Sequence, residues 1–555
     1  MLVNSAGVGR ELGLVADSCY HVLRRWLNKQ PDRACRGFPA EGEGMQEPHV
    51  GRLLQLLDRN PDGIVVTDAA AGEDLTAAQF LRRVRRTATA LSALGVTAGS
   101  RVVVGLPPGR LLVEAAFGCF FSGAIPAFLD PTIDPQALSR CLDELEPAAV
   151  LTDQAIDGVP VVTSEQFGVS ADAADESASA CDSYSADSIV MLMYTSGTTG
   201  LPKGAVWNWE NCDSQLNFYA KREATSEFIL FPMSSFNAVA LGCRAILPNF
   251  STFAPRSVDL PHLIAQFDAH PAEYMFGSPE LWRRYLDHTA SGNRGFAHPP
   301  ATVATAGAAI GRGLVAAMCE EFGNSTVLIP YAATEGLMPL TQITGETFLE
   351  QTAQWPIAEH GIPLGSPCDD VTIAVIDPDK TFDGAPAQAH DFLPDGTVGE
   401  LCISGRRASP AYYRRPKANA YAKFRDNGGN LWHRMGDIGH VQDGAVWLRC
   451  RKKDLMTLAQ GGWLYSDQIE QSINDAIGSR MCAAVVVADR LTVVFPSTEP
   501  ITSGGAAAII DTIRELEIDA DVLIVDGDLP VDSRHNSKID RTALVKSLSS
   551  LAGSA

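Results

Sequence analysis

The sequence predicts an α/β fold: a large N-terminal domain of two layered α/β subdomains with a β-rich subdomain, followed by a small α+β domain. Three observations lead to this prediction. Apolar strands alternate with helical stretches over the first part of the chain, short strands between Gly-, Pro- and Asp-rich turns follow, and the last part mixes both patterns. With 555 residues, the chain is long enough for several domains.

The alternation of helix and strand begins near residue 50. Helices are predicted over residues 50–57, 75–94 and 109–122, and strands over residues 64–67, 101–106, 125–129, 148–152, 189–193, 274–277, 302–306 and 327–330. Gly95 stands directly after the second helix, where a helix typically ends. Such alternation favours parallel strands covered by helices.

The pattern changes after Glu346. Strands predicted over residues 371–376, 399–404 and 445–448 form the β-rich part, and residues 467–477, 483–488, 491–495, 506–516 and 521–525 form a compact α+β pattern. The charged run 449–454 between them is either a solvated connector or a hinge. We therefore expect residues 1–49 to be a lead-in, 50–450 the large domain and 451–555 the small domain, with residues 170–187 as a surface linker.

Composition excludes several classes of partner and location. The chain has 44 Lys and Arg against 66 Asp and Glu, a net charge of -22, which repels nucleic-acid backbones. Its 12 cysteines include no Cys-x-x-Cys pair and indicate free thiols in a reducing cytosol. The apolar stretch 111–129 contains Glu114, two glycines and a proline, so it predicts a buried helix and strand rather than a membrane span. No signal peptide is evident, and a cytoplasmic location is expected.

The strongest motif is residues 194–204, Tyr-Thr-Ser-Gly-Thr-Thr-Gly-Leu-Pro-Lys-Gly, which follow an apolar strand. Its glycines let the backbone approach a ligand, and its hydroxyl groups and lysine can donate to phosphate oxygens. The candidate phosphate-binding residues are Thr195, Ser196, Gly197, Thr198, Thr199, Gly200 and Lys203. The Walker spacing is absent. A flexible linker is disfavoured, because the chain returns at once to apolar sequence.

These residues resemble the phosphate loop of the adenylate-forming superfamily, which includes acyl-CoA synthetases, peptide-synthetase adenylation domains and luciferases. The resemblance extends from about residue 50 to the C-terminus. It implies ATP and Mg²⁺ as cofactors, and a small mobile C-terminal domain that acts as a lid.

Residues 331–335, Tyr-Ala-Ala-Thr-Glu, resemble the family's aromatic-Gly-x-Thr-Glu element, with Ala332 in place of Gly. The resemblance implies that Tyr331 stacks on adenine, Thr334 meets the α-phosphate and Glu335 holds Mg²⁺. The segment that borders adenine in the family is matched by Gly307, Ala308 and Ala309.

Two more motifs follow in the family's order. Residues 433–437 resemble its Thr-Gly-Asp element, with Met435 in place of Thr, which implies that Asp437 accepts both ribose hydroxyls. Arg451 matches an arginine that also contacts the ribose, and Lys453 falls at the hinge position.

The last motif, residues 529–539, resembles the C-terminal catalytic-lysine loop. It implies that Lys538 stabilises the charge that grows during adenylation. His535 is a conceivable base for a later step, and its alternative role is that of a hydrogen-bond donor.

The finer resemblance is to the β-lactone synthetases of bacterial olefin and lactone pathways. Residues 231–248, residues 334–339 with 361–367, and residues 529–538 carry it. It implies an acyl pocket that involves Phe231, Phe236, Asn237 and Gly336. It also implies that a small-molecule carboxylic acid becomes an acyl-adenylate, whose own β-hydroxyl then displaces AMP in a step that depends on positioning.

The acceptor of the activated acyl group stays open. CoA ligases usually place a lysine shortly after the hinge, where this chain has Thr457, and Trp463 would crowd a pantetheine tunnel unless it packs elsewhere. Both departures argue against CoA. A fatty-acyl or aryl-acid CoA ligase, transfer to an amine and activation of a small oxyanion remain alternatives, and the oligomeric state is monomer or homodimer.

A non-catalytic nucleotide-binding scaffold is a further alternative. The changes at Ala332 and Met435 are its support. The presence of charged motif residues argues against a scaffold, because a scaffold needs none of them. These residues are Lys203, Glu335, Asp437, Arg451 and Lys538.

Overall fold

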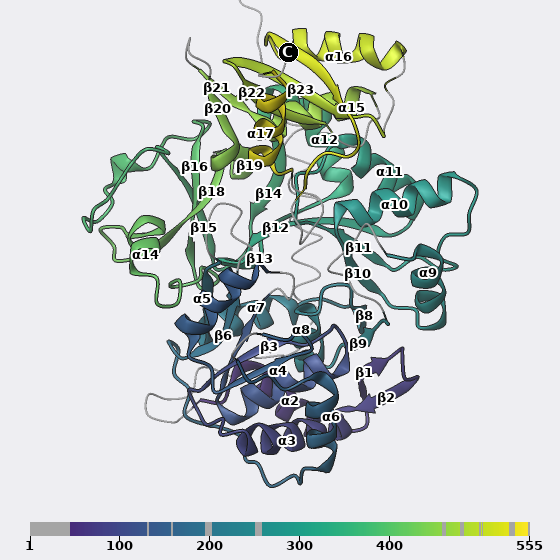
Figure 1. The fold of residues 1–555 in the computed structure, drawn as a ribbon, viewed down its shortest axis with the longest axis vertical. Helices are drawn as coiled ribbons and strands as arrows, with labels where there is room; N and C mark the ends of the chain where they lie inside the picture. Colours follow the sequence, from purple (N-terminus) through teal and green to yellow (C-terminus); the bar gives the residue numbers. More distant parts are fainter. Residues whose placement is uncertain are drawn as a thin grey trace, which may run out of the picture. The chain divides into compact units, whose positions relative to one another are not determined.

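The computed structural model describes residues 45–129, 133–156, 159–194, 202–249, 258–457, 462–477, 482–498, 501, 503–531 and 539–552 (Figure 1). Residues 46–555 form one compact unit. Layered sheets and helices confirm the predicted α/β class. The sequence also predicts a short helix near residues 15–27, and these lie outside the described residues.

One sheet of the described residues has five strands in the order β5-β3-β4-β6-β7. Their bounds are β3 Arg101–Gly105, β4 Ile125–Phe128, β5 Ala149–Thr152, β6 Ile189–Tyr194 and β7 Gly204–Asn208. The first four are parallel, while β7 returns antiparallel to β6. The accompanying helices are α3 Ala77–Ala93, α4 Arg110–Ser122, α5 Pro135–Leu145 and α6 Ser164–Ala173. Because β6 ends at Tyr194, the phosphate-loop motif starts at the carboxyl end of a parallel strand, where α/β sheets bind ligands.

The second sheet follows the order β15-β16-β18-β19-β14-β13-β12-β11-β10-β8-β9-β1-β2, with β17 paired to β18. Its first strands along the chain are β1 Ile64–Asp68, β2 Glu73–Thr76, β8 Ser226–Phe228, β9 Arg244–Leu247, β10 Tyr274–Gly277, β11 Thr302–Thr305 and β12 Thr326–Ala333. The others are β13 Gly336–Thr344, β14 Ile362–Pro367, β15 Val371–Ile376, β16 Gly399–Gly405, β17 Lys423–Arg425, β18 Leu431–Gln442 and β19 Ala445–Arg451. Pairing is parallel from β1 through β9, β8, β10 and β11 to β12, and antiparallel from β12 to β15. The antiparallel half contains the three strands predicted for the β-rich part, which are β15, β16 and β19.

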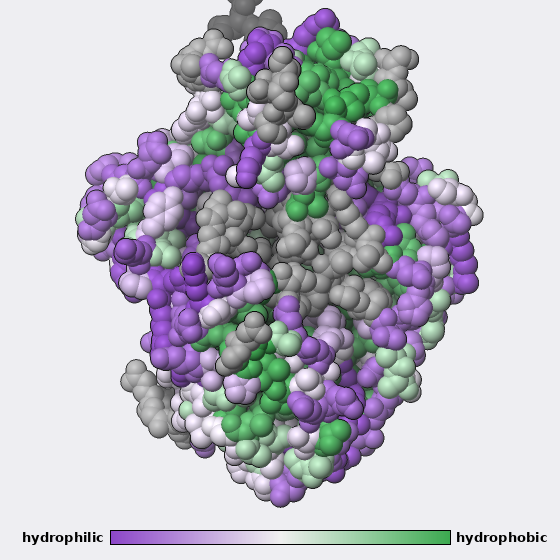
Figure 2. Space-filling view, in the orientation of Figure 1, coloured by the Kyte–Doolittle hydropathy of each residue, from purple (hydrophilic) through white to green (hydrophobic). Residues whose placement is uncertain are grey.

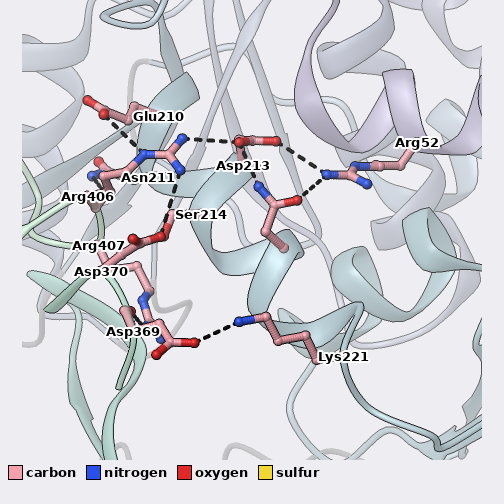
Figure 3. A network of polar contacts seen from close by, with 11 residues as sticks. Arg52, Glu210, Asn211, Asp213, Ser214, Lys221, Asp369, Asp370, Arg406 and Arg407 are labelled. Atoms are coloured by element: carbon pink, nitrogen blue, oxygen red, sulfur yellow. Dashed lines mark hydrogen bonds and ion pairs between the residues drawn. The ribbon is translucent and has the colours of Figure 1, made fainter. Parts of the chain in front are cut away.

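The helices of this part of the chain are α2 Pro48–Leu57, α7 Trp209–Tyr219, α8 Ser234–Leu241, α9 Leu260–Ala269, α10 Pro279–Ala290, α11 Arg312–Phe322, α12 Gly345–Gln354, α13 Ile357–His360 and α14 Pro416–Ala422. A charged network joins α7 to α2 and to the antiparallel half of the sheet (Figure 3). Arg406 contacts Glu210 and Asp213 of α7 at 3.2 and 3.1 Å, and Arg52 of α2 reaches Asp213 at 3.5 Å. Helix α7 is therefore held between α2 and the loop after β16 by polar contacts.

The C-terminal elements have a sheet and an apolar core of their own. The strands are β20 Leu455–Thr457, paired with β21 Trp463–Tyr465, and β22 Ala483–Val487, β23 Arg490–Pro496 and β24 Ala520–Val525 in the order β22-β23-β24. The helices are α15 Ser466–Ile477, α16 Ser503–Glu515 and α17 Arg541–Ala552. The Asp475 carboxylate accepts from the backbone N–H groups of Arg312 and Gly313, both at 2.8 Å. The predicted domain division near residue 451 stays a prediction.

Two predicted segments differ from the structure. The linker at 170–187 begins inside α6, and Tyr184 is buried with its hydroxyl 3.4 Å from the Phe120 carbonyl oxygen. The charged run 449–454 begins inside β19, where Arg449 is buried and donates to the Glu359 carbonyl and to the Gln468 amide oxygen at 2.5 and 2.9 Å. The interpretation as a solvated connector is therefore wrong for the first residues of the run. Charge in the local sequence did not indicate these partners, which lie far away along the chain.

Hydrophilic residues cover much of the face in Figure 2, and hydrophobic residues gather at its top and in its lower central part. The C-terminal elements carry five of the exposed large apolar side chains of the described residues: Trp463, Ile510, Val522, Leu523 and Ile524. In the described part of the chain, no helix combines the length and the apolar character needed to cross a membrane.

Glu470, near the start of α15, is buried. Its carboxylate accepts from the Ala484 N–H at 2.8 Å and pairs with Arg541 at 2.6 Å. Asp454 and Asp467 also pair with Arg541, at 3.1 and 3.3 Å. Burial raises the pKa of Glu470 from 4.5 to about 7, against the opposing effect of Arg541.

We expect Glu470→Gln to change how stability depends on pH. Between pH 4.5 and about 7, the folded wild type keeps a proton that the unfolded chain releases, so this group lowers the free energy of unfolding as pH rises. Glutamine does not titrate. The difference between the Tm of the variant and the Tm of wild type should therefore be a few degrees more positive at pH 8 than at pH 5. Glu350→Gln, on the exposed face of α12, is the matched control. An equal Tm difference at both pH values for Glu470→Gln would contradict this expectation.

Candidate active site

The turn between β12 and β13 consists of Thr334 and Glu335, because Ala333 pairs with Gly336. Two-residue hairpin turns usually need residues with positive φ, and neither turn residue has one. Contacts from elsewhere hold this turn instead. The Trp207 indole N–H donates to the Thr334 carbonyl, and the Ser409 N–H donates to the Glu335 carbonyl, both at 2.8 Å. The β12–β13 turn is therefore fixed by β7 and by the loop before α14.

The Glu335 side chain lies in a small cluster of charged groups around Tyr412. The Tyr412 hydroxyl donates to Glu335 Oε1 at 2.6 Å. Burial and the Glu335 charge raise the pKa of Tyr412 far above its usual range, so the phenol keeps its proton. The Lys203 ammonium lies 4.4 Å from the centre of the Tyr412 ring and the Lys423 ammonium 5.7 Å. Two cations and one carboxylate thus surround a single tyrosine.

Lys423 is a partly buried lysine of this cluster that no motif contained. Its ammonium donates to the Ser409 carbonyl. Burial lowers its pKa from 10.5 to about 7, Glu335 opposes this shift, and Lys203 adds to it. Its location places a titratable amine beside the predicted phosphate and metal residues.

Asp437 is buried in β18 between two predicted nucleotide-binding residues. The Tyr331 hydroxyl donates to Asp437 Oδ2 at 2.5 Å, and the Arg451 guanidinium lies 3.0 Å from Oδ1. Asp437 and Arg451 are register partners in β18 and β19. Burial and Asp437 raise the pKa of Tyr331, and Asp437 raises the pKa of Arg451. The β18–β19 hairpin and the distant strand β12 thus build one polar unit.

The predicted adenine border follows β11. Gly307 has a φ of 107°, a conformation that favours glycine, and a Cβ there would meet no atom within 4 Å. Its conformation, rather than crowding, therefore requires the glycine. Ala308 is half-buried, and Ala309 packs against a core cluster that contains Ile310 and Ile329.

Two predicted pocket residues lie close to β13. The Phe231 ring is 4.7 Å from that of Phe276, in a cluster that also contains Met338. Asn237 donates to the Gln215 amide oxygen at 3.2 Å, and Gln215 donates to the Met338 carbonyl at 2.8 Å. The structure thus brings Phe231 and Asn237 to the strand that begins at the β12–β13 turn.

The other two pocket residues have different surroundings. Phe236 is 2 % exposed and packs against Phe120 and Phe128, with ring centres 5.8 and 5.4 Å away. It belongs to the core near the five-stranded sheet. A Cβ on Gly336 would lie 2.7 Å from side-chain atoms of both Ile403 and Leu340, so close packing excludes a larger residue there.

Several predicted residues lie outside the described residues: Thr195, Ser196, Gly197, Thr198, Thr199, Gly200, His535 and Lys538. Lys453 is exposed in a short 3-10 turn after β19. Trp463, whose bulk argued against a pantetheine tunnel, begins β21 opposite Thr457 and is 40 % exposed. Sequence reasoning missed Trp207, Ser409, Tyr412 and Lys423. The aromatic and basic stretch 412–415 was the one local signal for them.

The residues present fit a magnesium nucleotide. No three His, Cys, Asp or Glu side chains of the described residues converge as a metal site. Mg²⁺ commonly needs only one or two carboxylates when phosphates and water supply its other ligands. Glu335, held by Tyr412 near Lys203, meets that requirement.

Curated relatives resemble the chain over most of its length. Olefin β-lactone synthetases from Stenotrophomonas maltophilia and Xanthomonas campestris pv. campestris are each 28 % identical, covering 89 % and 88 % of this chain and 97 % and 94 % of their own. A feruloyl-CoA synthase from Amycolatopsis is 26 % identical, covering 75 % of this chain and 82 % of its own.

Solved structures share the fold. ATP-bound MatB from Rhodopseudomonas palustris has a TM-score of 0.72 at 20 % identity and covers 91 % of this chain and 100 % of its own. An o-succinylbenzoate coenzyme A synthetase from Bacillus subtilis, in complex with ATP and a magnesium ion, has a TM-score of 0.70 at 18 % identity over 89 % and 98 % of the two chains.

The model of one enzyme family, described as AMP-binding enzyme, matches residues 55–413. These residues make up more than half of the chain and include the β12–β13 turn. The match confirms the family indicated by the sequence motifs. The chain belongs to the AMP-binding enzyme family and is an ATP-dependent adenylate-forming enzyme.

Proposed function

We propose that the protein joins a carboxylic acid to AMP, releases pyrophosphate and then closes the acyl-adenylate to a β-lactone. The polar unit of Tyr331, Asp437 and Arg451 carries this proposal, because it presents a buried carboxylate close to the turn that bears Thr334 and Glu335. The names of the two relatives at 28 % identity support the lactone step.

In this proposal the chain's residues bind ATP along its length. Tyr331, Gly307, Ala308 and Ala309 border the adenine, and Asp437 accepts the ribose hydroxyls while it pairs with Arg451. Thr334 and Lys203, with the phosphate loop, hold the phosphates. Glu335 would hold Mg²⁺, which supplies neutralising charge to the phosphates.

The chemistry has two balanced steps. A carboxylate oxygen of the acid bonds to the α-phosphorus, and the bond to pyrophosphate breaks. Lys538 stabilises the charge that develops on the phosphoryl oxygens. The β-hydroxyl oxygen of the same substrate then bonds to the acyl carbon, AMP leaves, and the hydroxyl proton passes to a base, for which His535 is our candidate. Because the second step is intramolecular, positioning of the acyl chain near Phe231 and Asn237 matters more than base strength.

The proposed division of labour follows the two predicted domains. Residues 50–450 bind ATP and the acid, and residues 451–555 carry Lys538 past a hinge at Lys453. We propose this arrangement from the order of the motifs along the chain.

The test is an incubation with ATP, Mg²⁺ and a β-hydroxy fatty acid, with and without CoA, followed by product identification by mass spectrometry. We expect AMP, pyrophosphate and a β-lactone without CoA. A thioester that forms only with CoA would replace the lactone step by a ligase reaction. If the protein binds ATP but releases no pyrophosphate with any acid of a panel of carboxylic acids, the chain is a nucleotide-binding scaffold.

A further inference from the structure

Tyr412 contacts both predicted phosphate-side groups of the site, although no motif contains it. Its hydroxyl donates to Glu335 Oε1 at 2.6 Å, and its ring faces the Lys203 ammonium at 4.4 Å. The side chain is 4 % exposed. One buried ring therefore separates the carboxylate proposed for the metal from the lysine proposed for the phosphates.

The backbone that carries Tyr412, residues 406–413, is fixed from the α7 side. Asn211 of α7 donates to the carbonyls of Arg406 and Ala408 at 2.7 and 3.1 Å. The Arg406 side chain lies among the acidic residues of the network in Figure 3. Buried Arg407 donates to the carbonyls of Pro339 and Asp369. These contacts tie the first half of the segment to α7 and to β13.

The second half of the segment is fixed to the strand that leaves the phosphate loop. The Val206 N–H donates to the Ala411 carbonyl at 2.9 Å, and the Tyr413 N–H donates to the Gly204 carbonyl at 2.8 Å. Tyr412 is thus held between two backbone hydrogen bonds. Its hydroxyl has little freedom to follow a moving partner.

The same segment runs beside the β12–β13 turn. The Leu337 N–H donates to the Arg407 carbonyl at 3.0 Å, and the Ser409 N–H to the Glu335 carbonyl at 2.8 Å. Lys423 holds the Ser409 carbonyl from the other side. These bonds fix the backbone of the turn, but the direction of the Glu335 carboxylate depends on its own hydrogen bond to Tyr412.

We propose that Tyr412 is a positioning residue whose hydroxyl orients the Glu335 carboxylate for a divalent cation. Its ring holds the Lys203 ammonium in a fixed position for contact with the phosphates. The inference rests on the proposed function for the identity of the nucleotide. A donor bound to Oε1 leaves Oε2 and the remaining lone pairs for a hard cation. Partners of metal ligands act in this way, and their loss typically weakens metal binding roughly tenfold to a hundredfold.

Two substitutions separate the two contacts. Tyr412→Phe removes the hydroxyl and keeps the ring, so the Mg²⁺ concentration for half-maximal pyrophosphate release should rise about tenfold or more, with an unchanged KM for the acid. Tyr412→Leu removes both contacts. It should also reduce the thermal stabilisation by ATP in the presence of EDTA, which Tyr412→Phe should retain.

A readout independent of turnover is Mn²⁺ binding in the presence of ATP, measured by electron paramagnetic resonance. We expect weaker Mn²⁺ binding in Tyr412→Phe and wild-type binding in Tyr184→Phe, the control, whose buried hydroxyl contacts the Phe120 carbonyl. Wild-type Mg²⁺ dependence and Mn²⁺ binding in folded Tyr412→Phe would overturn the proposal.

Glu335→Gln gives a second route if Tyr412→Phe does not fold. The glutamine keeps an acceptor for Tyr412 but loses the charge, so Mn²⁺ binding should weaken while stability is retained. Unchanged Mn²⁺ binding in this variant would also overturn the proposal. A wild type that binds Mn²⁺ and ATP but releases no pyrophosphate with any acid would sink the proposed reaction and leave the role of Tyr412 supported.

Discussion

Asp437→Asn is expected to raise the KM for ATP about a hundredfold, because a neutral amide replaces the carboxylate that we propose for both ribose hydroxyls. The substitution keeps the shape of the side chain. It removes the charge that pairs with Arg451 at 3.0 Å, and it weakens the bond from the Tyr331 hydroxyl. ATP–pyrophosphate exchange at saturating acid measures the effect.

The matched control for this prediction is Asp443→Asn. Asp443 lies between β18 and β19 at a φ of 52°, a conformation that asparagine adopts readily. It therefore tests the same hairpin away from the site, and its exchange kinetics should equal those of wild type. An unchanged KM for ATP in folded Asp437→Asn would remove Asp437 from the nucleotide site.

Lys538→Ala should lower the rate of adenylation by roughly a hundredfold to a thousandfold, as expected when a charge that stabilises the transition state is lost. ATP binding should change little, because the phosphate loop and Asp437 supply most of its proposed contacts. Single-turnover pyrophosphate release measures the first step. Lactone formation from a supplied acyl-adenylate measures the second and should persist.

Lys546→Ala is the control for Lys538→Ala. Lys546 is exposed on α17, a short distance along the chain, and among the described residues it forms no hydrogen bond or ion pair with a proposed site residue. Both variants lower the charge of the C-terminal part equally. Similar losses in the two variants would indicate a general charge effect, and normal adenylation in Lys538→Ala would exclude its assigned role.

Local sequence predicted the elements whose signals are local. The strand predicted at 101–106 is β3, Arg101–Gly105, and the helix at 109–122 is α4, Arg110–Ser122, which ends at Gly123 with a positive φ. The helix predicted from residue 75 begins instead at Ala77, because Thr76 caps it through reciprocal bonds with Gln79. The antiparallel returns β7 and β13 were not predicted, since their polar and apolar residues alternate less clearly.

In the site, too, residues in local motifs were predicted and residues with distant partners were not. Tyr331, Glu335, Asp437 and Arg451 were named from motifs, but Tyr412 was not, because its partner Glu335 is 77 positions away. Trp207 is 127 positions from the Thr334 carbonyl that it holds. In a single sequence, the identity of an aromatic residue or a lysine does not show which distant residue it contacts.

By itself, the sequence determined the fold class, the family and the identity and order of the motif residues, because each depends on short stretches of chain. The tertiary structure decided how those residues are held. The register of β18 and β19 places Arg451 on Asp437, and the segment 406–413 places Tyr412 on Glu335. The physical reason is that the Glu335–Tyr412 contact joins segments far apart in the chain, and that the register of a strand pair is set by the packing of the whole sheet.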